Sequence, residues 1–293
     1  MKYVSFFILI LTLLSCGSRK QIVEKNPEEV LKMGKDVDNI AEVVNDSTEK
    51  NEPILKTNSE ESLETNNGFH QSLSKRFLPF HQLWDELLQK HVSNVGIVNY
   101  KSFKTDHKKL LDYIYVLSLL YKSDNFQSLS KNDKLAFWIN AYNAMTVDLI
   151  LRNYPVKSIK EIKDPWKQRL WKLTDIDYNL GEIEHQILRK MNEPRIHFAI
   201  VCASVSCPKL QNKAFTASKL DEQLTNATRE FLSDTSKNSI AQNNLELSKI
   251  FQWFSKDFKQ NGSLIHFLNQ YSNIKISEKA KIKFKDYNWN LNE

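Results

Sequence analysis

Glycine is scarce in this chain, and the shortage argues against one large group of enzymes. Six glycines occur in 293 residues, and only Gly96, Gly181 and Gly262 lie beyond residue 68. None of the three belongs to a Gly-x-Gly-x-x-Gly or Walker pattern. Loops that hold nucleotide phosphates depend on such glycines. We therefore expect no nucleotide site and no cofactor.

Aromatic residues are missing from residues 21–68, which carry 5 lysines against 12 acidic residues. A segment with no Phe, Tyr or Trp and a high net charge cannot bury enough apolar surface to fold. We predict that residues 16–68 form a disordered acidic tether. Residues 69–293 then form one globular domain, since about 225 residues suit a single domain with a large core.

Long hydrophobic runs are also absent. The apolar run at residues 3–14 follows Lys2 and is too short for a membrane span, which needs about 20 residues. A short positive start, an apolar stretch and a small residue before the cut describe an export signal at residues 1–15. The ending Leu13-Leu14-Ser15-Cys16 resembles the bacterial lipobox. We predict a lipid on Cys16 and an exported, membrane-anchored lipoprotein, sorted to the outer membrane.

Charge is uneven along the chain. Residues 69–293 carry 33 basic and 23 acidic side chains, in contrast to the acidic tether. An exported, lipid-anchored protein rarely meets nucleic acid, so we expect no nucleic-acid partner. The expected partners are the membrane, through Cys16, and an envelope polyanion or another protein.

Hydrophobic periodicity and capping residues predict a mixture of helices and short strands. Because strands and helices do not alternate regularly, we predict an α+β fold in a single domain. The expected helices cover residues 73–91, 110–120, 130–154, 182–188, 220–232, 251–258 and 264–271. The expected extended segments cover residues 95–103, 170–173, 176–180, 196–201, 239–247 and 281–287.

Five motifs suggest a family. They are Phe-Trp-Ile-Asn-Ala-Tyr-Asn-Ala at 137–144, Ile-Glu-His-Gln-Ile-Leu-Arg at 183–189, residues 195–208 with Cys202 and Cys207, residues 247–258, and Tyr-Asn-Trp at 287–289. In order and spacing they resemble the domain of unknown function 547 family over residues 80–289. The resemblance implies an exported bacterial domain with no agreed activity. Asn288 departs from the aspartate that is more usual in the family.

Cys202 and Cys207 are the two thiols that remain once Cys16 carries a lipid. An oxidising, exported compartment favours a disulfide between them. A strand would separate them by about 16 Å, so a bridge requires a turn at residues 203–206.

A nucleophilic thiol is the second interpretation of Cys202. His197 is near in sequence, but strand alternation would turn it to the opposite face. His185, beside Glu184 at a helix start, is the better candidate base. Asn140 and Asn143 are further catalytic candidates that would orient an imidazole or stabilise an oxyanion. Equally, they are buried amides that join a helix to its neighbours.

A metal site at His185, His197, Cys202 and Cys207 is not favoured, because eleven residues separate the histidines. The favoured function is a ligand- or partner-binding module of the cell envelope. The alternative is a thiol-dependent hydrolase or acyltransferase that uses a Cys-His pair.

Overall fold

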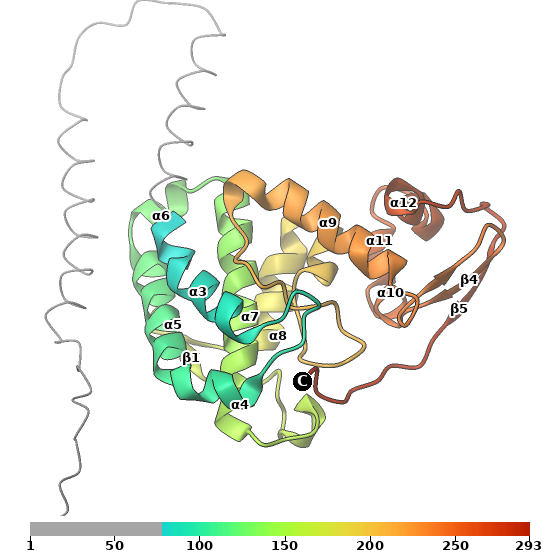
Figure 1. Cartoon of the computed structure of the whole chain (residues 1–293). Coiled ribbons are helices and arrows are strands. Elements are labelled where there is room, and N and C mark those ends of the chain that lie inside the picture. Colours follow the sequence, from blue (N-terminus) through green and yellow to red (C-terminus); the bar gives the residue numbers. More distant parts are fainter. Residues whose placement is uncertain (1–77) are drawn as a thin grey trace, which may run out of the picture. The chain divides into compact units, whose positions relative to one another are not determined.

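The structure, a computed structural model, describes residues 78–293. The predicted signal at residues 1–15, Cys16 and the tether at residues 16–68 lie outside the described residues. The domain is a mixture of helices and small sheets, which confirms the predicted α+β class. Figure 1 shows helices α3 to α9 on one side and the α10–α12 and β4–β5 segments on the other.

The α-helices lie at α3 (Gln82–His91), α4 (Tyr100–Phe103), α5 (His107–Lys122), α6 (Asn125–Ser128), α7 (Lys131–Asn153), α8 (Leu180–Glu182), α9 (Leu220–Ser233), α10 (Ile250–Trp253), α11 (Ser255–Phe258) and α12 (Leu264–Tyr271). Short 3-10 turns lie at Leu78–His81, Lys104–Asp106, Ile159–Glu161, Leu188–Met191, Pro194–Phe198 and Ala217–Lys219. A π-helical turn covers Ile183–Ile187.

Helix α7 is the central element of the helical part. Ser130 caps it by accepting a hydrogen bond from the Asp133 backbone N–H, as the sequence predicts. The helix is buried on nearly every side, because its apolar residues between Leu135 and Leu151 lie around the whole circumference rather than along one stripe. It packs against α4, α5 and α8. Because α7 is fixed on all sides, it is a rigid base for the segments that cross it.

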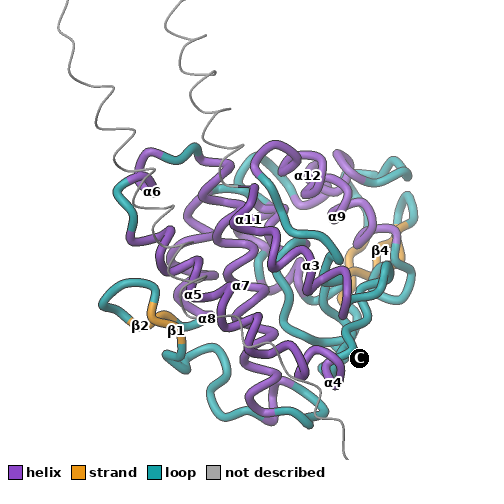
Figure 2. The backbone as a smooth tube through the Cα atoms, turned by 60° about the vertical axis from the view of Figure 1, so that its left-hand side comes forward, coloured by secondary structure: helices purple, strands orange, loops and turns teal. Residues whose placement is uncertain are grey.

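Two small sheets lie apart from each other, as Figure 2 shows. Strands β1 (Trp171–Lys172) and β2 (Asp177–Tyr178) form an antiparallel hairpin. Strand β4 (Asn244–Leu247) pairs antiparallel with β3 (Ser239–Ile240) and parallel with β5 (Lys281–Phe284). Helices α10 to α12 supply the crossover between β4 and β5.

The core consists of two hydrophobic clusters. The first joins α3, α5, α7 and the start of α9 to residues 196–215, and the second joins the end of α9 to β4 and α10–α12. The 3-10 turn Pro194–Phe198 lies where they meet, since Ile196 belongs to the first cluster and Phe198 to the second. This junction positions the pocket described below.

Several predicted elements are wrong. The strand predicted at residues 196–201 is the end of the 3-10 turn Pro194–Phe198 followed by a loop. The extended segment predicted at residues 95–103 ends in helix α4. The helix predicted over residues 251–258 is interrupted at Phe254, between α10 and α11. Of the helix predicted from residue 73, residues 73–77 lie outside the described part.

The C-terminal tail returns from β5 to the helical part, where Figure 1 places the chain end. It runs along the loop between the two cysteines. Val205 N donates to Asn290 O at 2.8 Å, and Asn292 N donates to Ala203 O at 3.2 Å. The tail thereby holds the loop in a defined conformation.

Candidate functional site

A pocket of about 240 Å³ opens at the junction of the two hydrophobic clusters. Its lining combines several aromatic rings with a few polar side chains from distant parts of the sequence. The lining residues are Tyr142, Trp166, Glu184, His185, His197, Ile200, Val201, Cys202, Cys207, Pro208, Ile250, Trp253, Phe254, Tyr287 and Trp289. A concave, mostly apolar pocket with a few convergent polar groups is the usual form of a small-molecule site.

The π-helical turn Ile183–Ile187 supplies Glu184 and His185. It follows α8, whose start is capped by Asn179 Oδ1, which accepts from Glu182 N at 2.8 Å. Glu184 is almost fully buried and accepts a hydrogen bond from Tyr142 OH at 3.0 Å. His185 is about half exposed, and its Nδ1 lies 3.9 Å from Glu184 Oε1. π-helical turns occur often at functional sites.

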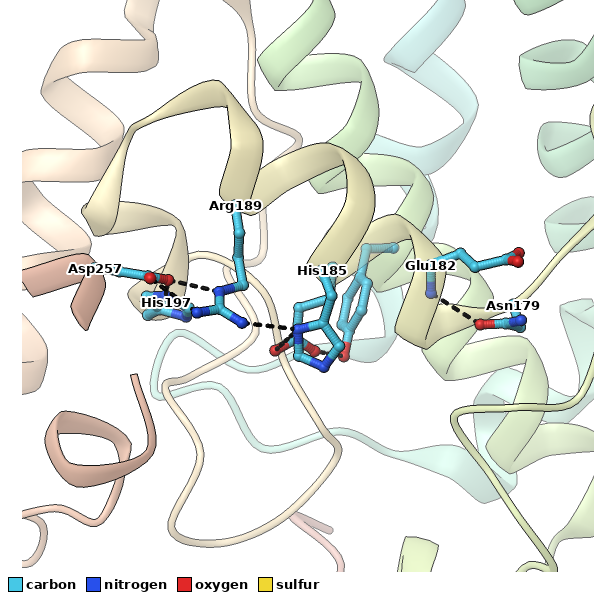
Figure 3. A network of polar contacts seen from close by, with 8 residues as sticks. Asn179, Glu182, His185, Arg189, His197 and Asp257 are labelled. Carbon is cyan, nitrogen blue, oxygen red and sulfur yellow. Dashed lines mark hydrogen bonds and ion pairs between the residues drawn. The ribbon is translucent and has the colours of Figure 1, made fainter. Parts of the chain in front are cut away.

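Arg189 links the two histidines of the pocket, since it contacts His185 directly and reaches His197 through the carboxylate of Asp257, as Figure 3 shows. Its Nε and Nη2 donate to the two oxygens of Asp257 at 2.6 and 2.8 Å, and its Nη1 lies 3.2 Å from His185 Nδ1. His197 Nε2 lies 2.8 Å from Asp257 Oδ2. We call Glu184, His185, Arg189, His197 and Asp257 the Arg189 cluster.

Burial and pairing set the pKa values within the Arg189 cluster. Burial lowers the pKa of His197, although its hydrogen bond to Asp257 acts in the opposite direction. Burial alone would raise the pKa of Asp257, but hydrogen bonds from Arg189 and His197 together hold it below its usual value. His197 is also stacked on Phe254, with ring centroids 3.9 Å apart. It is therefore a fixed wall of the pocket.

Cys202 and Cys207 lie side by side at the pocket. Their Sγ atoms are 3.1 Å apart, longer than the roughly 2.05 Å of a disulfide, so both are free thiols. The candidate disulfide is thus not a bond in this structure. The turn that it required does exist, because Cys207 N donates to Ser204 O at 3.0 Å.

The two thiols differ in environment. Cys202 is partly exposed, whereas Cys207 is 4% exposed. The hydrogen bond between the thiols, with those from Ser204 and Tyr287, lowers the pKa of Cys202. Burial raises the pKa of Cys207 well above its usual value. Cys202 is therefore the more reactive thiol, since only the thiolate attacks.

Asn140 and Asn143 do not line the pocket. Asn140 Nδ2 donates to Phe215 O at 2.8 Å, and Asn140 Oδ1 accepts from Phe215 N at 3.0 Å. Asn143 Nδ2 donates to Ala199 O at 2.9 Å, and its Oδ1 accepts from Val201 N at 3.0 Å. Both amides join α7 to the backbone segments that cross it. This arrangement is the structural alternative given above for these two residues.

The expected partnership of Cys202 with a histidine is not a hydrogen bond here. Cys202 Sγ contacts Cys207, Ser204 Oγ at 3.1 Å and Tyr287 OH at 3.2 Å. His185 and Cys202 line the same pocket, but the hydrogen-bond partner of His185 is Arg189. The strand-based argument against His197 loses its premise, because residues 194–198 form a 3-10 turn.

Sequence reasoning missed Arg189, Asp257, Tyr142 and the aromatic walls. A signal for most of them was present, since the motifs at 137–144, 183–189, 247–258 and 287–289 contain all but Trp166. The motifs do not show which of their residues line the same pocket.

Two further properties concern residues 78–293 alone. In this range no three side chains of His, Cys, Asp or Glu come together as ligands for a metal ion. Likewise, none of the helices described in this range combines the length and the apolar character that a membrane crossing needs.

Residues 126–232 match the protein family described as "Protein of unknown function, DUF547". The match supports the resemblance over this range, which includes Tyr142, Glu184, His185 and both pocket thiols. It ends before α10 and the C-terminal tail, which supply Trp253, Tyr287 and Trp289. No curated protein and no solved structure matches the chain.

Proposed function

We propose that this chain is an exported, lipid-anchored envelope protein whose domain binds a small organic cation in the aromatic pocket. The observation that carries the ligand class is Glu184, a carboxylate 7% exposed at the wall of an otherwise largely aromatic pocket. The Arg189 cluster contains one guanidinium and two carboxylates. The guanidinium of Arg189 pairs with both oxygens of Asp257, so Glu184 is the carboxylate of the cluster with which a bound ammonium group would pair.

The aromatic rings support the same ligand class. Trp166, Trp253 and Tyr287 present indole and phenol rings to the pocket. Aromatic cages of this kind attract ammonium groups through the ring quadrupole, by about 2 kcal/mol when the site is desolvated. One cation–π contact is already present at the pocket wall, because Lys160 Nζ lies 4.6 Å from the centroid of the Trp289 ring.

Choline and its uncharged carbon isostere, dimethylbutanol, test the proposal, since they differ in charge but hardly in shape. Tryptophan fluorescence of the purified chain should show choline binding at least about tenfold more tightly, equivalent to about 1.4 kcal/mol. Glu184→Gln should abolish this preference. Glu182→Gln is the matched control, because Glu182 lies two residues before Glu184, pairs with Arg169 and does not line the pocket. Equal binding of both compounds to the parent chain would refute the cation site.

The anchor has its own test. Cys16→Ala should move the protein from the membrane fraction to the soluble fraction of the cells that express it, because the lipid-carrying thiol is gone. Immunoblotting of the two fractions measures the change. A variant that remains as membrane-bound as the parent would show that another segment holds the protein there.

A thiol hydrolase or acyltransferase that uses Cys202 with His185 is the second candidate. The partial exposure and lowered pKa of Cys202 favour it. Iodoacetamide labelling of Cys202 that disappears in His185→Ala would support this candidate. Labelling that is unchanged in His185→Ala would leave Cys202 without the histidine base that acyl transfer requires.

A further inference from the structure

The spacing of the pocket thiols suits a reaction that needs two of them. The Sγ atoms of Cys202 and Cys207 lie 3.1 Å apart, so forming a bond of about 2.05 Å requires an approach of only about 1 Å. Acyl transfer by a thiol has no use for a second sulfur at this distance. Thiol–disulfide exchange does, because the second thiol releases the first from a mixed disulfide.

We propose that Cys202 and Cys207 form a dithiol that exchanges with small-molecule disulfides entering the pocket, with Cys202 as the attacking thiol and Cys207 as the resolving thiol. The exchange reaction does not require the cation proposed above, although both use the same pocket. It concerns small molecules because the thiols lie in a pocket of about 240 Å³.

The reaction proceeds in two displacements. Cys202 Sγ, as a thiolate, attacks one sulfur of the substrate disulfide, whose S–S bond breaks, and the leaving thiolate takes a proton from water. Cys207 loses its proton to water and attacks Cys202 Sγ, which forms the protein disulfide and releases the second substrate thiol. Two electrons pass from the protein to the substrate, so one dithiol reduces one substrate disulfide, and a further round requires an external thiol that reduces the protein disulfide.

The surroundings divide the roles between the sulfurs. Cys202 is the partly exposed thiol, and the hydroxyl groups of Ser204 and Tyr287 lie 3.1 and 3.2 Å from its Sγ, where they stabilise a thiolate. Cys207 is almost fully buried and reaches Cys202 rather than solvent. An accessible attacking thiol beside a protected resolving thiol is the arrangement that two-step exchange requires.

The backbone between the thiols is held in place rather than left free. Ala203 adopts a left-handed conformation with φ of 56°, which is strained for a residue with a Cβ atom. The C-terminal tail fixes the same loop, since Ser204 bridges to Leu291 and Ser206 N donates to Asn288 O at 3.2 Å. A fixed loop keeps the two sulfurs close in the reduced state.

Dithiodipyridine, a neutral aromatic disulfide, tests the proposal because it releases thiopyridone, which absorbs in the near ultraviolet. All proteins are full-length and carry Cys16→Ala, so that only the two pocket thiols remain, and all are reduced and then freed of reductant. One equivalent of dithiodipyridine should release two equivalents of thiopyridone and leave an intramolecular Cys202–Cys207 disulfide without a pyridyl adduct. Absorbance and peptide mass spectrometry measure these outcomes.

Single-cysteine variants assign the two steps. Cys207→Ser, and Cys207→Ala if serine is not tolerated at this buried position, should release one equivalent and retain the pyridyl group on Cys202. Cys202→Ser should react at least about tenfold more slowly, because its remaining thiol is buried and little ionised. A parent chain that retains a pyridyl group on Cys202 beside an unreacted Cys207 would overturn the proposal, and so would faster modification of Cys207.

Discussion

Replacing Asn143 with alanine should lower the free energy of unfolding by about 2–6 kcal/mol and slow disulfide exchange at Cys202. The side chain is 1% exposed and makes two hydrogen bonds, to Ala199 O and from Val201 N. Its removal leaves both backbone groups buried without a partner, at about 1–3 kcal/mol each. Because Val201 directly precedes Cys202, the loss also loosens the position of the attacking thiol.

Asn140 provides the matched control. It lies on the same helix and makes the same pair of backbone hydrogen bonds, but to Phe215, away from the pocket. Asn140→Ala should therefore lose a similar free energy of unfolding and keep the exchange rate of the parent. Urea unfolding and thiopyridone release measure the two properties. Equal slowing in both variants would mean that general destabilisation, and not the placement of Cys202, controls exchange.

Helices with complete local signals could be predicted from the sequence. Helix α7 has a capping serine at its start and Pro155 beyond its end, and these signals fix its limits without reference to the rest of the fold. The run at residues 196–201 has no such signals. A short apolar run does not distinguish a strand from a buried turn. Here Pro194 at the first position of the turn and the burial of the turn between the two clusters favour the 3-10 conformation.

The candidate site depends on pairings that no local signal contains. The sequence indicates polar residues inside apolar motifs, and the structure brings His185, His197, Cys202 and Cys207 to one pocket. The sequence does not indicate that Asp257 joins Arg189 to His197, although 60 or more residues separate Asp257 from each of them. For Asn140 and Asn143 the motif alone leaves two interpretations, because a buried amide near a site has the same sequence signature in either role.

Burial of His81 should make the domain sensitive to mild acid. His81 is 8% exposed, and its Nδ1 lies 2.8 Å from Tyr113 OH. Burial lowers its pKa from 6.5 to about 4. Because the folded state binds this proton less readily than the unfolded chain, stability is complete above pH 6.5 and falls as the pH decreases toward 4. A shift of this size corresponds to about 3 kcal/mol.

Urea unfolding should therefore show a free energy of unfolding that decreases from pH 7 to pH 4.5. Much of this decrease should disappear in His81→Asn, whose amide still offers Tyr113 a hydrogen-bond acceptor. The pKa values of His91 and His197 are also lowered by burial, so a part of the fall remains in this variant. The carboxyl groups of Asp106 and Asp257 have lowered pKa values and lose their contributions mainly below about pH 4. His266→Asn is the control, because this imidazole is exposed and its replacement should leave the fall intact. If the free energy of unfolding of His81→Asn has the same pH dependence as that of the parent, the lowered pKa of His81 does not account for the acid sensitivity of the domain.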